Sequence, residues 1–368
     1  MTYDLSFNND QLRITINLSK IQKNYQQFRE ITKTDVGYVC KANAYSLGAA
    51  PVAKAVYEVG CRTFFVATTQ EGIYVRQSLS KDAKIYILHG PDQNDLDQLI
   101  ENDLIPVLNN QHQIDLWVKK SLQISQKLKA ALHFDTGMNR LGLSVKEMQP
   151  IIDATKNIDI VHVLSHLACA SEIDHPYNKQ QKDLFQYVID AFSGTETSLV
   201  AAEGVSLGTD YYYDMARVGI GLYGVLPHEQ GSINHKFDLA FLPQAKIIQT
   251  REIDKGESVG YGQSFVAKKK IRTAVIGIGF ADGFPREASN KANVYIGKNK
   301  AAVIGRISMD LTIIDVTDLP EDVSSIGNWV DIFQDSATFN DLSKNSGRSI
   351  YELMALFAGV RYNRIYKN

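Results

Sequence analysis

Short apolar runs alternate with amphipathic stretches over the first two-thirds of the chain. Eight such runs, rich in Val, Ile, Leu or Phe, lie between residues 35 and 226, and each has the length and composition of a strand buried on both faces. The runs are 36–40, 63–68, 84–90, 104–108, 130–135, 160–165, 198–202 and 217–223. Amphipathic segments such as 50–58 and 179–192 separate them. Eight strand–helix units in about 190 residues predict an α/β fold, an N-terminal (β/α)8 TIM-type barrel.

An open, doubly wound parallel sheet is the alternative arrangement for the same alternation of strands and helices. That fold usually has a glycine-rich phosphate-binding turn after its first strand. Here the first run is followed by Lys41-Ala-Asn-Ala-Tyr45, which is not such a turn. The barrel is therefore the preferred interpretation.

The pattern changes after Pro243, where strand-like runs follow one another with turns between them. Asp254–Glu257 and Gly297–Lys300 have the composition of turns, and a short helical tail is expected at about 349–358. The strand-like runs are 244–253, 271–278, 301–307, 311–316 and 329–333. We therefore expect a barrel domain at 1–238 and a mainly antiparallel β domain at 239–368. An early strand at 13–18 is one too many for the barrel and is available to pair with the β domain.

Composition and charge limit the classes of function. The 368 residues carry a net charge of −2, without the basic excess expected of a nucleic-acid-binding protein. The three cysteines, Cys40, Cys61 and Cys169, are too few and too scattered for a disulfide framework and fit a reducing compartment. The polar N-terminus does not have the pattern of a signal peptide, and no apolar run approaches the ~20 residues of a membrane helix. We expect a cytoplasmic protein that binds neither nucleic acid nor membrane.

Candidate catalytic residues stand where the predicted strands end, which is where barrel enzymes place their active sites. Lys41 follows the first strand, His166 follows the sixth, and Arg140 closes the segment after the fifth. Arg217 lies at the start of the eighth strand. One lysine, one histidine and two arginines at one mouth suit an anionic cofactor and a lysine that forms a Schiff base with it.

Each of these residues, taken alone, also fits an ordinary structural role. Lys41 could be a solvated loop lysine, His166 a packed core histidine, and Arg140 and Arg217 ion-pair partners. No metal site is expected, because no pair of ligand-type residues has zinc-site spacing. His162 and His166 are four residues apart in a strand, not on one helix face.

Read together, the motifs of this chain resemble those of the alanine racemase family. The similarity covers nearly the whole chain, in the family's order. The motifs are 39–45 (VCKANAY), 135–142 (DTGMNRLG), 217–224 (RVGIGLYG), 259–262 (VGYG), 279–283 (GFADG), 305–310 (GRISMD) and 350–352 (IYE).

The resemblance implies a homodimer whose cofactor, pyridoxal 5′-phosphate, sits in the barrel mouth and whose site is completed by the partner's β domain. Lys41 is the lysine that carries the cofactor covalently. Four groups would hold its phosphate: the Tyr45 and Tyr351 side chains and the backbone N–H groups of Gly219 and Ile220. Glycine at 219 lets the backbone approach that phosphate.

The resemblance also implies the reaction, which interconverts L-alanine and D-alanine and supplies D-alanine for peptidoglycan. Lys41 is the base on one face of the substrate, and Tyr261 of the other subunit is the base on the opposite face. His166 and Arg217 would support Tyr261 through a connected network, with Arg217 at the pyridine nitrogen. Arg140 and the Met309 N–H of the partner's β domain would bind the carboxylate of alanine.

Several positions depart from the family pattern. Many relatives have a lysine, modified to a carbamate, where this chain has His133, so Arg140 must be oriented by another group. Ala201 and Ala202 stand where relatives often have an Asn-Ser pair near the phosphate. Phe280 replaces a tyrosine near the substrate entrance, and Ser46-Leu47 replaces Gly-His after the lysine motif.

Three alternative functions remain open at this point. A racemase of serine or of a broader range of amino acids would share every motif. A related pyridoxal-phosphate decarboxylase would need an acidic residue at the pyridine nitrogen and a cysteine in the β domain, yet the chain has Arg217 and no cysteine after Cys169. A non-enzymatic pyridoxal-phosphate carrier would be a single barrel without a second domain.

Overall fold

The computed structural model describes residues 10–226, 237–357, 359 and 361–368. It divides into two compact units, which we call the barrel unit (residues 21–237) and the β unit (residues 1–20 and 238–368). Residues 10–20, which the sequence analysis placed in the barrel domain with a strand at 13–18 available to the β domain, thus group with the β unit. The reason is strand β1 (Leu12–Asn17), which pairs antiparallel with β11 (Phe241–Ile253) in the register Leu12↔Ala245 to Ile16↔Phe241.

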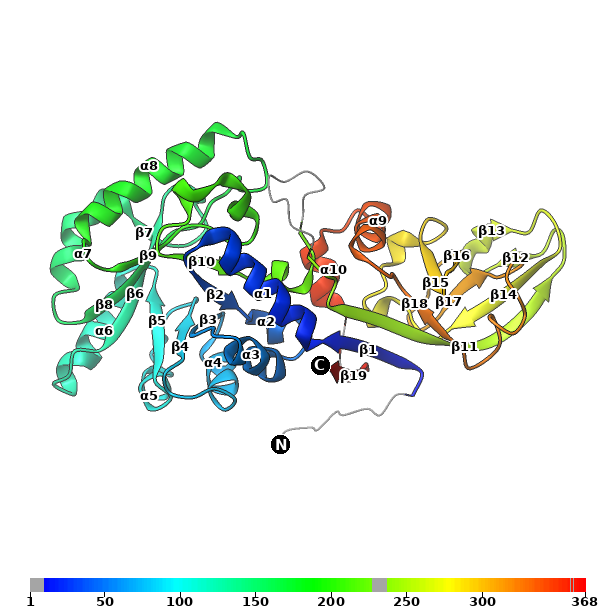
Figure 1. Ribbon diagram of the computed structural model, residues 1–368, viewed down its shortest axis with the longest axis horizontal. Coiled ribbons are helices and arrows are strands. Elements are labelled where there is room, and N and C mark those ends of the chain that lie inside the picture. The colour runs from blue at the N-terminus through cyan, green and yellow to red at the C-terminus, as the bar shows by residue number, and fades with distance from the viewer. Residues whose placement is uncertain (1–9, 227–236, 358, 360) are drawn as a thin grey trace. The chain divides into compact units, whose positions relative to one another are not determined.

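The barrel unit contains the eight parallel strands that the apolar runs predict, in the order β10-β2-β3-β4-β5-β6-β8-β9 (Figure 1). They are β2 (Asp35–Val39), β3 (Thr63–Val66), β4 (Lys84–Ile87), β5 (Leu104–Leu108), β6 (Lys129–Asp135), β8 (Asp159–Leu164), β9 (Glu196–Ser198) and β10 (Met215–Val218). A parallel bridge between Ala201 and Arg217 joins the last two segments and closes the ring. The predicted barrel is therefore confirmed. A two-residue strand, β7 (Leu143–Ser144), pairs with β6.

Helices cover the outside of these strands (Figure 1). They are α1 (Leu18–Thr32), α3 (Ala49–Glu58), α4 (Thr69–Arg76), α5 (Leu96–Glu101), α6 (Gln111–Gln123), α7 (Met148–Ala154) and α8 (Pro176–Ala191). The predicted helical segments 50–58 and 179–192 correspond to α3 and α8. Helix α4 begins with a capping box, in which the Thr68 side chain accepts from the Glu71 N–H and the Glu71 carboxylate accepts from the Thr68 N–H.

Several predicted strands end earlier than expected, among them 63–68, 84–90 and the last two of the barrel. The run 198–202 is a strand only to Ser198, because Ala202 is already helical and starts the 3-10 turn η2 (Glu203–Leu207). The run 217–223 is a strand only to Val218, and Ile220–Tyr223 forms the 3-10 turn η4. These residues are apolar because they are buried, and their burial does not require strand geometry.

The interior of the barrel is filled by side chains from almost every strand. Phe65 and Tyr86 stack at its centre with ring centroids 5.0 Å apart. The buried cluster consists of Phe65, Tyr86, Ile105, Val107, Ala131, Leu164 and Met215, with Val39, Leu88 and Val161 packed against it. This is a packed core and not a pore, as expected for a barrel of eight strands.

The β unit contains a sheet in the order β14-β17-β16-β15-β18-β11-β1-β19, in which β11 also pairs with β14 and so closes the strands β11 and β14–β18 into a ring. Neighbours are antiparallel except β1 and β19, which are parallel. The remaining strands are β12 (Ser258–Val259), β13 (Phe265–Val266), β14 (Ile271–Ile276), β15 (Asn293–Ile296), β16 (Asn299–Val303), β17 (Thr312–Asp315), β18 (Trp329–Asp331) and β19 (Asn363–Lys367). The predicted, mainly antiparallel β domain is confirmed. The expected tail helix is α10 (Ile350–Leu356), and α9 (Ser336–Ser346) was not expected.

Candidate active site

Polar side chains at the barrel mouth follow a simple rule of position. Side chains alternate between the two faces of a strand, so the residue two positions after an interior core residue faces the same side, one layer nearer the mouth. Inside strands the pairs are Ala131 and His133 in β6, and Met215 and Arg217 in β10. Lys41, Asn109 and His166 lie one or two residues beyond the last residues of β2, β5 and β8. Burial lowers the pKa of His166 well below its ordinary value, and Arg217, Arg140, His133 and Lys41 all lie near enough to lower it further. The structure thus brings together the residues of the barrel unit that the sequence analysis selected at separate strand ends.

Lys41 is the first residue of the short helical turn α2 (Lys41–Tyr45), and the turn is left-handed. Ala42, Asn43 and Ala44 have φ values of 53°, 53° and 56°. Left-handed backbone costs about 1–2 kcal/mol for each non-glycine residue, so the turn needs external support. Glu71 supplies part of it by accepting from the Ala42 N–H at 2.6 Å, and the Asn43 side chain accepts from the Ala49 N–H at 2.8 Å.

The surroundings of Lys41 favour a neutral amine. Burial lowers the pKa of Lys41, and the positive charge of Arg140 lowers it further, against the opposing effect of Glu71. A neutral amine is the form that attacks a carbonyl carbon or accepts a proton. The lowered pKa of Lys41 is compatible with a nucleophile or base, although its side chain is exposed.

Tyr45, Gly219 and Ile220 form a small polar cradle beside Lys41. The hydroxyl of Tyr45 lies near the Ile220 N–H, and the buried Tyr45 side chain packs edge-on against Tyr223. A Cβ atom added to Gly219 would lie 2.2 Å from the Tyr45 hydroxyl oxygen, so only glycine fits at this position. Consecutive backbone N–H groups next to a tyrosine hydroxyl are a suitable arrangement for a phosphate.

Arg217 is almost fully buried, at 4% exposure, and is held by neutral acceptors. One Nη donates to the Ser198 hydroxyl, and the other donates to the carbonyl oxygens of Ser165 (2.5 Å) and Leu199 (3.1 Å). Burial lowers the pKa of the guanidinium well below its ordinary value. Within the described part of the chain the Nε–H makes no hydrogen bond. The Nε–H and one hydrogen of the Nη that donates to Ser198 are thus the donors of Arg217 left without a partner among the described residues.

His133 is held as a neutral hydrogen-bond acceptor. The Asn109 side-chain NH2 donates to the carbonyl oxygens of Val107 (2.8 Å) and Leu88 (3.0 Å), which fixes the orientation of this amide. Its oxygen therefore faces His133 Nδ1, 2.9 Å away, and Nδ1 must carry the proton. Nε2 is left as the acceptor. Burial, with the charges of Arg217 and Arg140, lowers the pKa of His133 to about 4.

Arg140 lies at the end of a tightly turned loop. The Asp135 carboxylate accepts from the N–H groups of Gly137 (2.8 Å) and Asn139 (3.1 Å), which shapes the segment between strand and arginine. The Arg140 side chain is exposed and, within residues 10–226, 237–357, 359 and 361–368, makes no hydrogen bond or ion pair. It is free to bind an anion.

The buried histidine predicts acid sensitivity. A histidine whose pKa is lowered on folding binds a proton more readily in the unfolded state, so the free energy of unfolding falls as the pH falls from about 6.5 towards about 4. We expect His133→Gln, whose amide can still donate to Asn109, to remove up to about 3 kcal/mol of this acid-dependent loss. Urea unfolding of the cofactor-free protein at pH 7 and pH 4.5 measures it. His112→Gln, on the exposed face of α6, is the control and should keep the wild-type sensitivity. Equal sensitivity in both variants would contradict the assignment.

The other three predicted residues lie in the β unit and are exposed. Tyr261 begins the 3-10 turn η5 (Tyr261–Gln263) and is 69% exposed, while Met309 and Tyr351 are 56% and 37% exposed. The Met309 carbonyl oxygen accepts from the Ala281 N–H at 3.0 Å. In the part of the chain that is described, the Met309 N–H has no hydrogen-bond partner.

Sequence reasoning missed several residues that organise the mouth. Asn109, Ser165, Ser198 and Glu71 all hold a predicted residue or its backbone in place. Asn109 could have been found by the two-residue rule, because it follows the interior residue Val107. The others depend on which strands are neighbours and in which register they pair.

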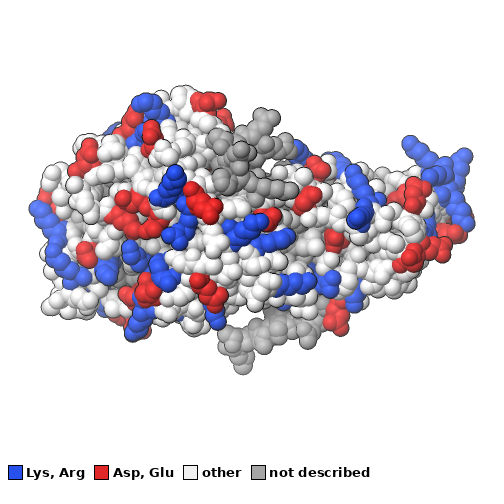
Figure 2. Space-filling model, viewed as in Figure 1, with Lys and Arg blue, Asp and Glu red and all other residues white. Residues whose placement is uncertain are grey.

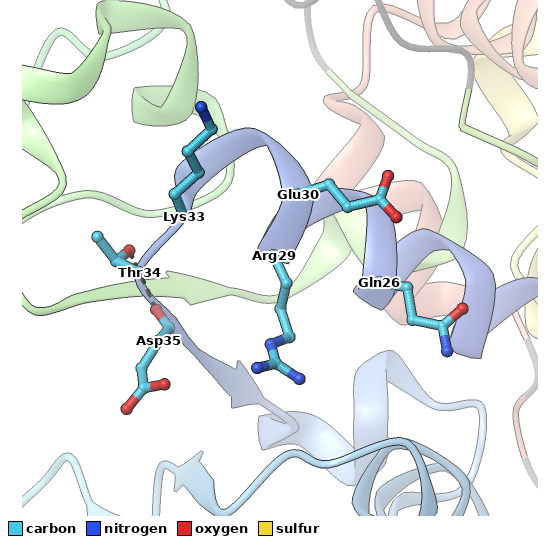
Figure 3. Close-up of a pocket in the computed structure, with 6 residues that line it drawn as sticks. All are labelled: Gln26, Arg29, Glu30, Lys33, Thr34 and Asp35. Atoms are coloured by element: carbon cyan, nitrogen blue, oxygen red, sulfur yellow. Dashed lines mark hydrogen bonds between the residues drawn. The ribbon is translucent and has the colours of Figure 1, made fainter.

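A surface hollow of the barrel unit is not part of this site. It is lined by Gln26, Arg29, Glu30, Lys33, Thr34 and Asp35 (Figure 3). Lys33, Thr34 and Asp35 lead into the first residue of β2, so the hollow is at the end of the strand opposite Lys41. Its charges are mixed, and its side chains point apart in Figure 3.

The face of the molecule shown in Figure 2 has mixed charge, with lysine and arginine interspersed among aspartate and glutamate. No helix among the described residues is long and apolar enough to cross a membrane. The same residues contain no group of three His, Cys, Asp or Glu side chains that could hold a metal ion.

Comparison with known proteins agrees with the geometry of the mouth. Residues 16–227 match the family described as alanine racemase, N-terminal domain, and residues 240–366 match alanine racemase, C-terminal domain. The alanine racemase of Rickettsia rickettsii (strain Sheila Smith) is 39% identical over 357 residues, which are 96% of this chain and 98% of the relative. That of Rhodospirillum rubrum is 38% identical over 96% of this chain and 95% of the relative.

Solved structures give the same result. A crystal structure of alanine racemase from Bartonella henselae with covalently bound pyridoxal phosphate superposes with a TM-score of 0.90 at 34% identity, and covers 97% of this chain and 99% of that one. The biosynthetic alanine racemase of Pseudomonas aeruginosa superposes with a TM-score of 0.87 at 29% identity, over 97% of this chain and 99% of that one. Both halves of the chain and their order match, so this protein belongs to the alanine racemase family.

Proposed function

We propose that this protein is a pyridoxal-phosphate-dependent isomerase that interconverts L-alanine and D-alanine. The observation that carries the proposal is the Lys41 amine at the end of strand β2, whose pKa is lowered by its partial desolvation and by Arg140 and which stands near a glycine-lined polar cradle. A lysine of this kind can form an imine, and the cradle can hold a phosphate. The Bartonella henselae relative contains covalently bound pyridoxal phosphate.

The residues of the barrel mouth fit that cofactor in three respects. Lys41 supplies the amine, and Tyr45 with the N–H groups of Gly219 and Ile220 would hold the phosphate. The free Nε–H of Arg217 would donate to the pyridine nitrogen and so keep that nitrogen unprotonated. We include His166 and, from the β unit, Tyr351 among the cofactor-binding residues.

When bound, pyridoxal phosphate supplies the electron sink that makes the Cα–H bond of an amino acid acidic. The protein must hold a proton acceptor on one face of Cα and a proton donor on the other. Lys41 Nζ would serve one face, and the Tyr261 hydroxyl of the other subunit would serve the opposite face. A tyrosine of ordinary pKa is a weak base, so Tyr261 needs the support that we assign to His166 and Arg217.

Two groups would bind the carboxylate of alanine. Arg140 has a guanidinium without a protein partner in the described part of the chain, and Met309 of the partner's β domain has a free N–H. Two parallel N–H groups of an arginine guanidinium, together with one backbone N–H, can donate hydrogen bonds to both oxygens of a carboxylate. The proposal further includes a homodimer with shared sites, a location in the cytoplasm and a role in supplying D-alanine for peptidoglycan.

A panel assay tests this function. Purified protein, with and without added pyridoxal phosphate, is incubated with each enantiomer of alanine, serine and larger amino acids. We expect racemisation of alanine that depends on the cofactor. Faster racemisation of serine would establish a broader racemase, and release of an amine in place of the D-enantiomer would establish a decarboxylase.

The attachment site of the cofactor can be tested directly. Borohydride reduction of the cofactor-loaded protein should fix a phosphopyridoxyl group on Lys41, and peptide mass mapping should find it there. Lys41→Arg should lose the label, whereas Lys54→Arg, at an exposed position of α3, should keep it. A label on any other lysine would refute the assignment of Lys41.

A further inference from the structure

A line of polar side chains crosses the otherwise apolar interior of the barrel below Arg217. His162 is completely buried, and its ring lies 5.4 Å from that of Tyr86 and 6.1 Å from that of Phe65. A polar ring in such surroundings is stable only if both nitrogens are hydrogen-bonded. Nδ1 lies 3.1 Å from the Glu196 carboxylate, and Nε2 lies 2.7 Å from the Ser198 hydroxyl.

The chemistry of these groups fixes the direction of every hydrogen bond. Arginine can only donate, so the Ser198 hydroxyl oxygen accepts from Arg217. A carboxylate can only accept, so His162 Nδ1 carries a proton and donates to Glu196. Burial lowers the pKa of His162 despite the opposing effect of Glu196, so the ring is neutral and Nε2 accepts. The single Ser198 proton then points at Nε2, and all the donors point from Arg217 towards Glu196.

The carboxylate stands at the opposite end of the barrel from the mouth. Glu196 is the first residue of β9, and the Lys84 ammonium, on the first residue of β4, lies 3.5 Å from it. Burial raises the pKa of Glu196, but the hydrogen bond from His162 and the positive charge of Lys84 outweigh burial and lower it. Glu196 is therefore ionised at neutral pH and, with its side chain 21% exposed, remains in contact with solvent.

The buried Arg217 guanidinium needs a negatively charged group that compensates its positive charge. Its direct acceptors are two carbonyl oxygens and one hydroxyl, and none of its contacts within the described residues is a carboxylate. A buried charge without compensation is costly. A hydroxyl polarised by a histidine–carboxylate pair is a stronger acceptor than a hydroxyl alone.

We propose that Ser198, His162 and Glu196 form a directed hydrogen-bond chain that keeps the buried Arg217 guanidinium charged and fixed in position at the barrel mouth. The three are positioning residues, since they act on the reaction through Arg217. The consequence for catalysis rests on the proposed function, but the chain itself can be tested without any turnover.

The direct test is nuclear magnetic resonance of the purified protein. In protein labelled with ¹⁵N-histidine, we expect the His162 resonances, identified by their loss in His162→Gln, to show a protonated Nδ1 and an unprotonated Nε2. In protein labelled with ¹⁵N-arginine, we expect slowly exchanging Arg217 side-chain protons, identified by their loss in Arg217→Lys. Ser198→Ala and Glu196→Gln should each speed that exchange at least 10-fold.

Two control variants separate this chain from a general effect of charge or packing. Asp159→Asn removes an exposed carboxylate from the first residue of the neighbouring strand β8, and Lys84→Met removes the ion-pair partner of Glu196 but leaves the carboxylate. Both should keep the wild-type exchange rate. Unchanged Arg217 exchange in folded Glu196→Gln, an unprotonated His162 Nδ1, or equal acceleration in Asp159→Asn would each overturn the proposal.

Kinetics give the second readout. Glu196→Gln should lower kcat for alanine by about 10-fold and leave KM nearly unchanged, because carboxylate binding does not use Arg217. A protein that racemises nothing would refute the proposed function, yet the resonance experiment would still decide whether the chain exists.

Discussion

Two inactive variants, Lys41→Ala and Tyr261→Ala, should recover roughly a quarter of wild-type activity when they are unfolded, mixed and refolded together. Each variant alone loses one of the two proposed bases, and a positioned acid or base contributes about 10²–10⁴-fold to rate. In a two-fold dimer with shared sites, a mixed dimer has one doubly substituted site and one intact site. With random pairing about half of the dimers are mixed, so about a quarter of all sites are intact.

The matched control pairs two lesions that both lie in the barrel unit. A mixture of Lys41→Ala and Arg140→Ala should recover nothing, because every site of a mixed dimer then carries one lesion. Racemisation rate and native mass are measured on the same samples. If Lys41→Ala and Tyr261→Ala form mixed dimers by mass and yet remain inactive, Tyr261 acts within its own chain or not at all.

The strands of the barrel were predictable because of where they lie. A strand buried on both faces must be apolar throughout, and a run such as 104–108 (LIPVL), with Asn102-Asp103 before it and Asn109-Asn110 after it, is typical of such a strand. The ends of the runs were not predictable. Leu199 and Val200 are fully buried outside any strand, so hydrophobicity continues after the strand geometry has stopped.

Two of the elements missed in the β unit, α9 and β19, carry weak patterns, while β15 was also missed. Helix α9 buries only Phe339, Leu342 and Ser346, and its sequence is mostly polar. Strand β19 is half exposed and pairs with β1, which is more than 300 residues away in sequence. The local sequence pattern carries no information about a pairing strand so far away. Strand β19 is therefore recognised only in the assembled sheet.

Site residues were predictable from the sequence where the residue type alone indicates the chemistry. They were not predictable where the role of a residue depends on its neighbours in the fold. Lys41, His166 and Arg217 stand out at strand ends because their charges are unusual beside apolar runs. The partners of His162 could not be inferred, since they depend on the pairing of β8 with β9. The pairing of β6 with β8 also shifts register between Ala130 and Ala131, which breaks any simple count from strand ends.

The second prediction with a large expected effect is a substitution of Gly219, in the polar cradle that would hold the cofactor's phosphate. We expect Gly219→Ala to weaken pyridoxal phosphate binding by about 100-fold, because the added Cβ would lie 2.2 Å from the Tyr45 hydroxyl and would displace the side chain that closes the cradle. That loss equals about 3 kcal/mol, the size of one or two hydrogen bonds to a charged group. The same overpacking should lower the free energy of unfolding of the cofactor-free protein by about 1–3 kcal/mol.

A double-mutant cycle isolates the cause, since Tyr45→Phe removes the hydroxyl and leaves the ring in place. The nearest ring carbon would then be 3.1 Å from the new Cβ, a contact that a small shift of the ring can relieve. Gly219→Ala should therefore cost much less stability in the Tyr45→Phe background than in the wild type, a positive coupling between two residues in contact. Urea unfolding of the four cofactor-free proteins measures this coupling, and titration with pyridoxal phosphate measures its effect on binding. If Gly219→Ala costs the same stability in both backgrounds, the cradle does not depend on the close approach of Gly219 and Tyr45. Its requirement for glycine would then have to come from the bound phosphate alone.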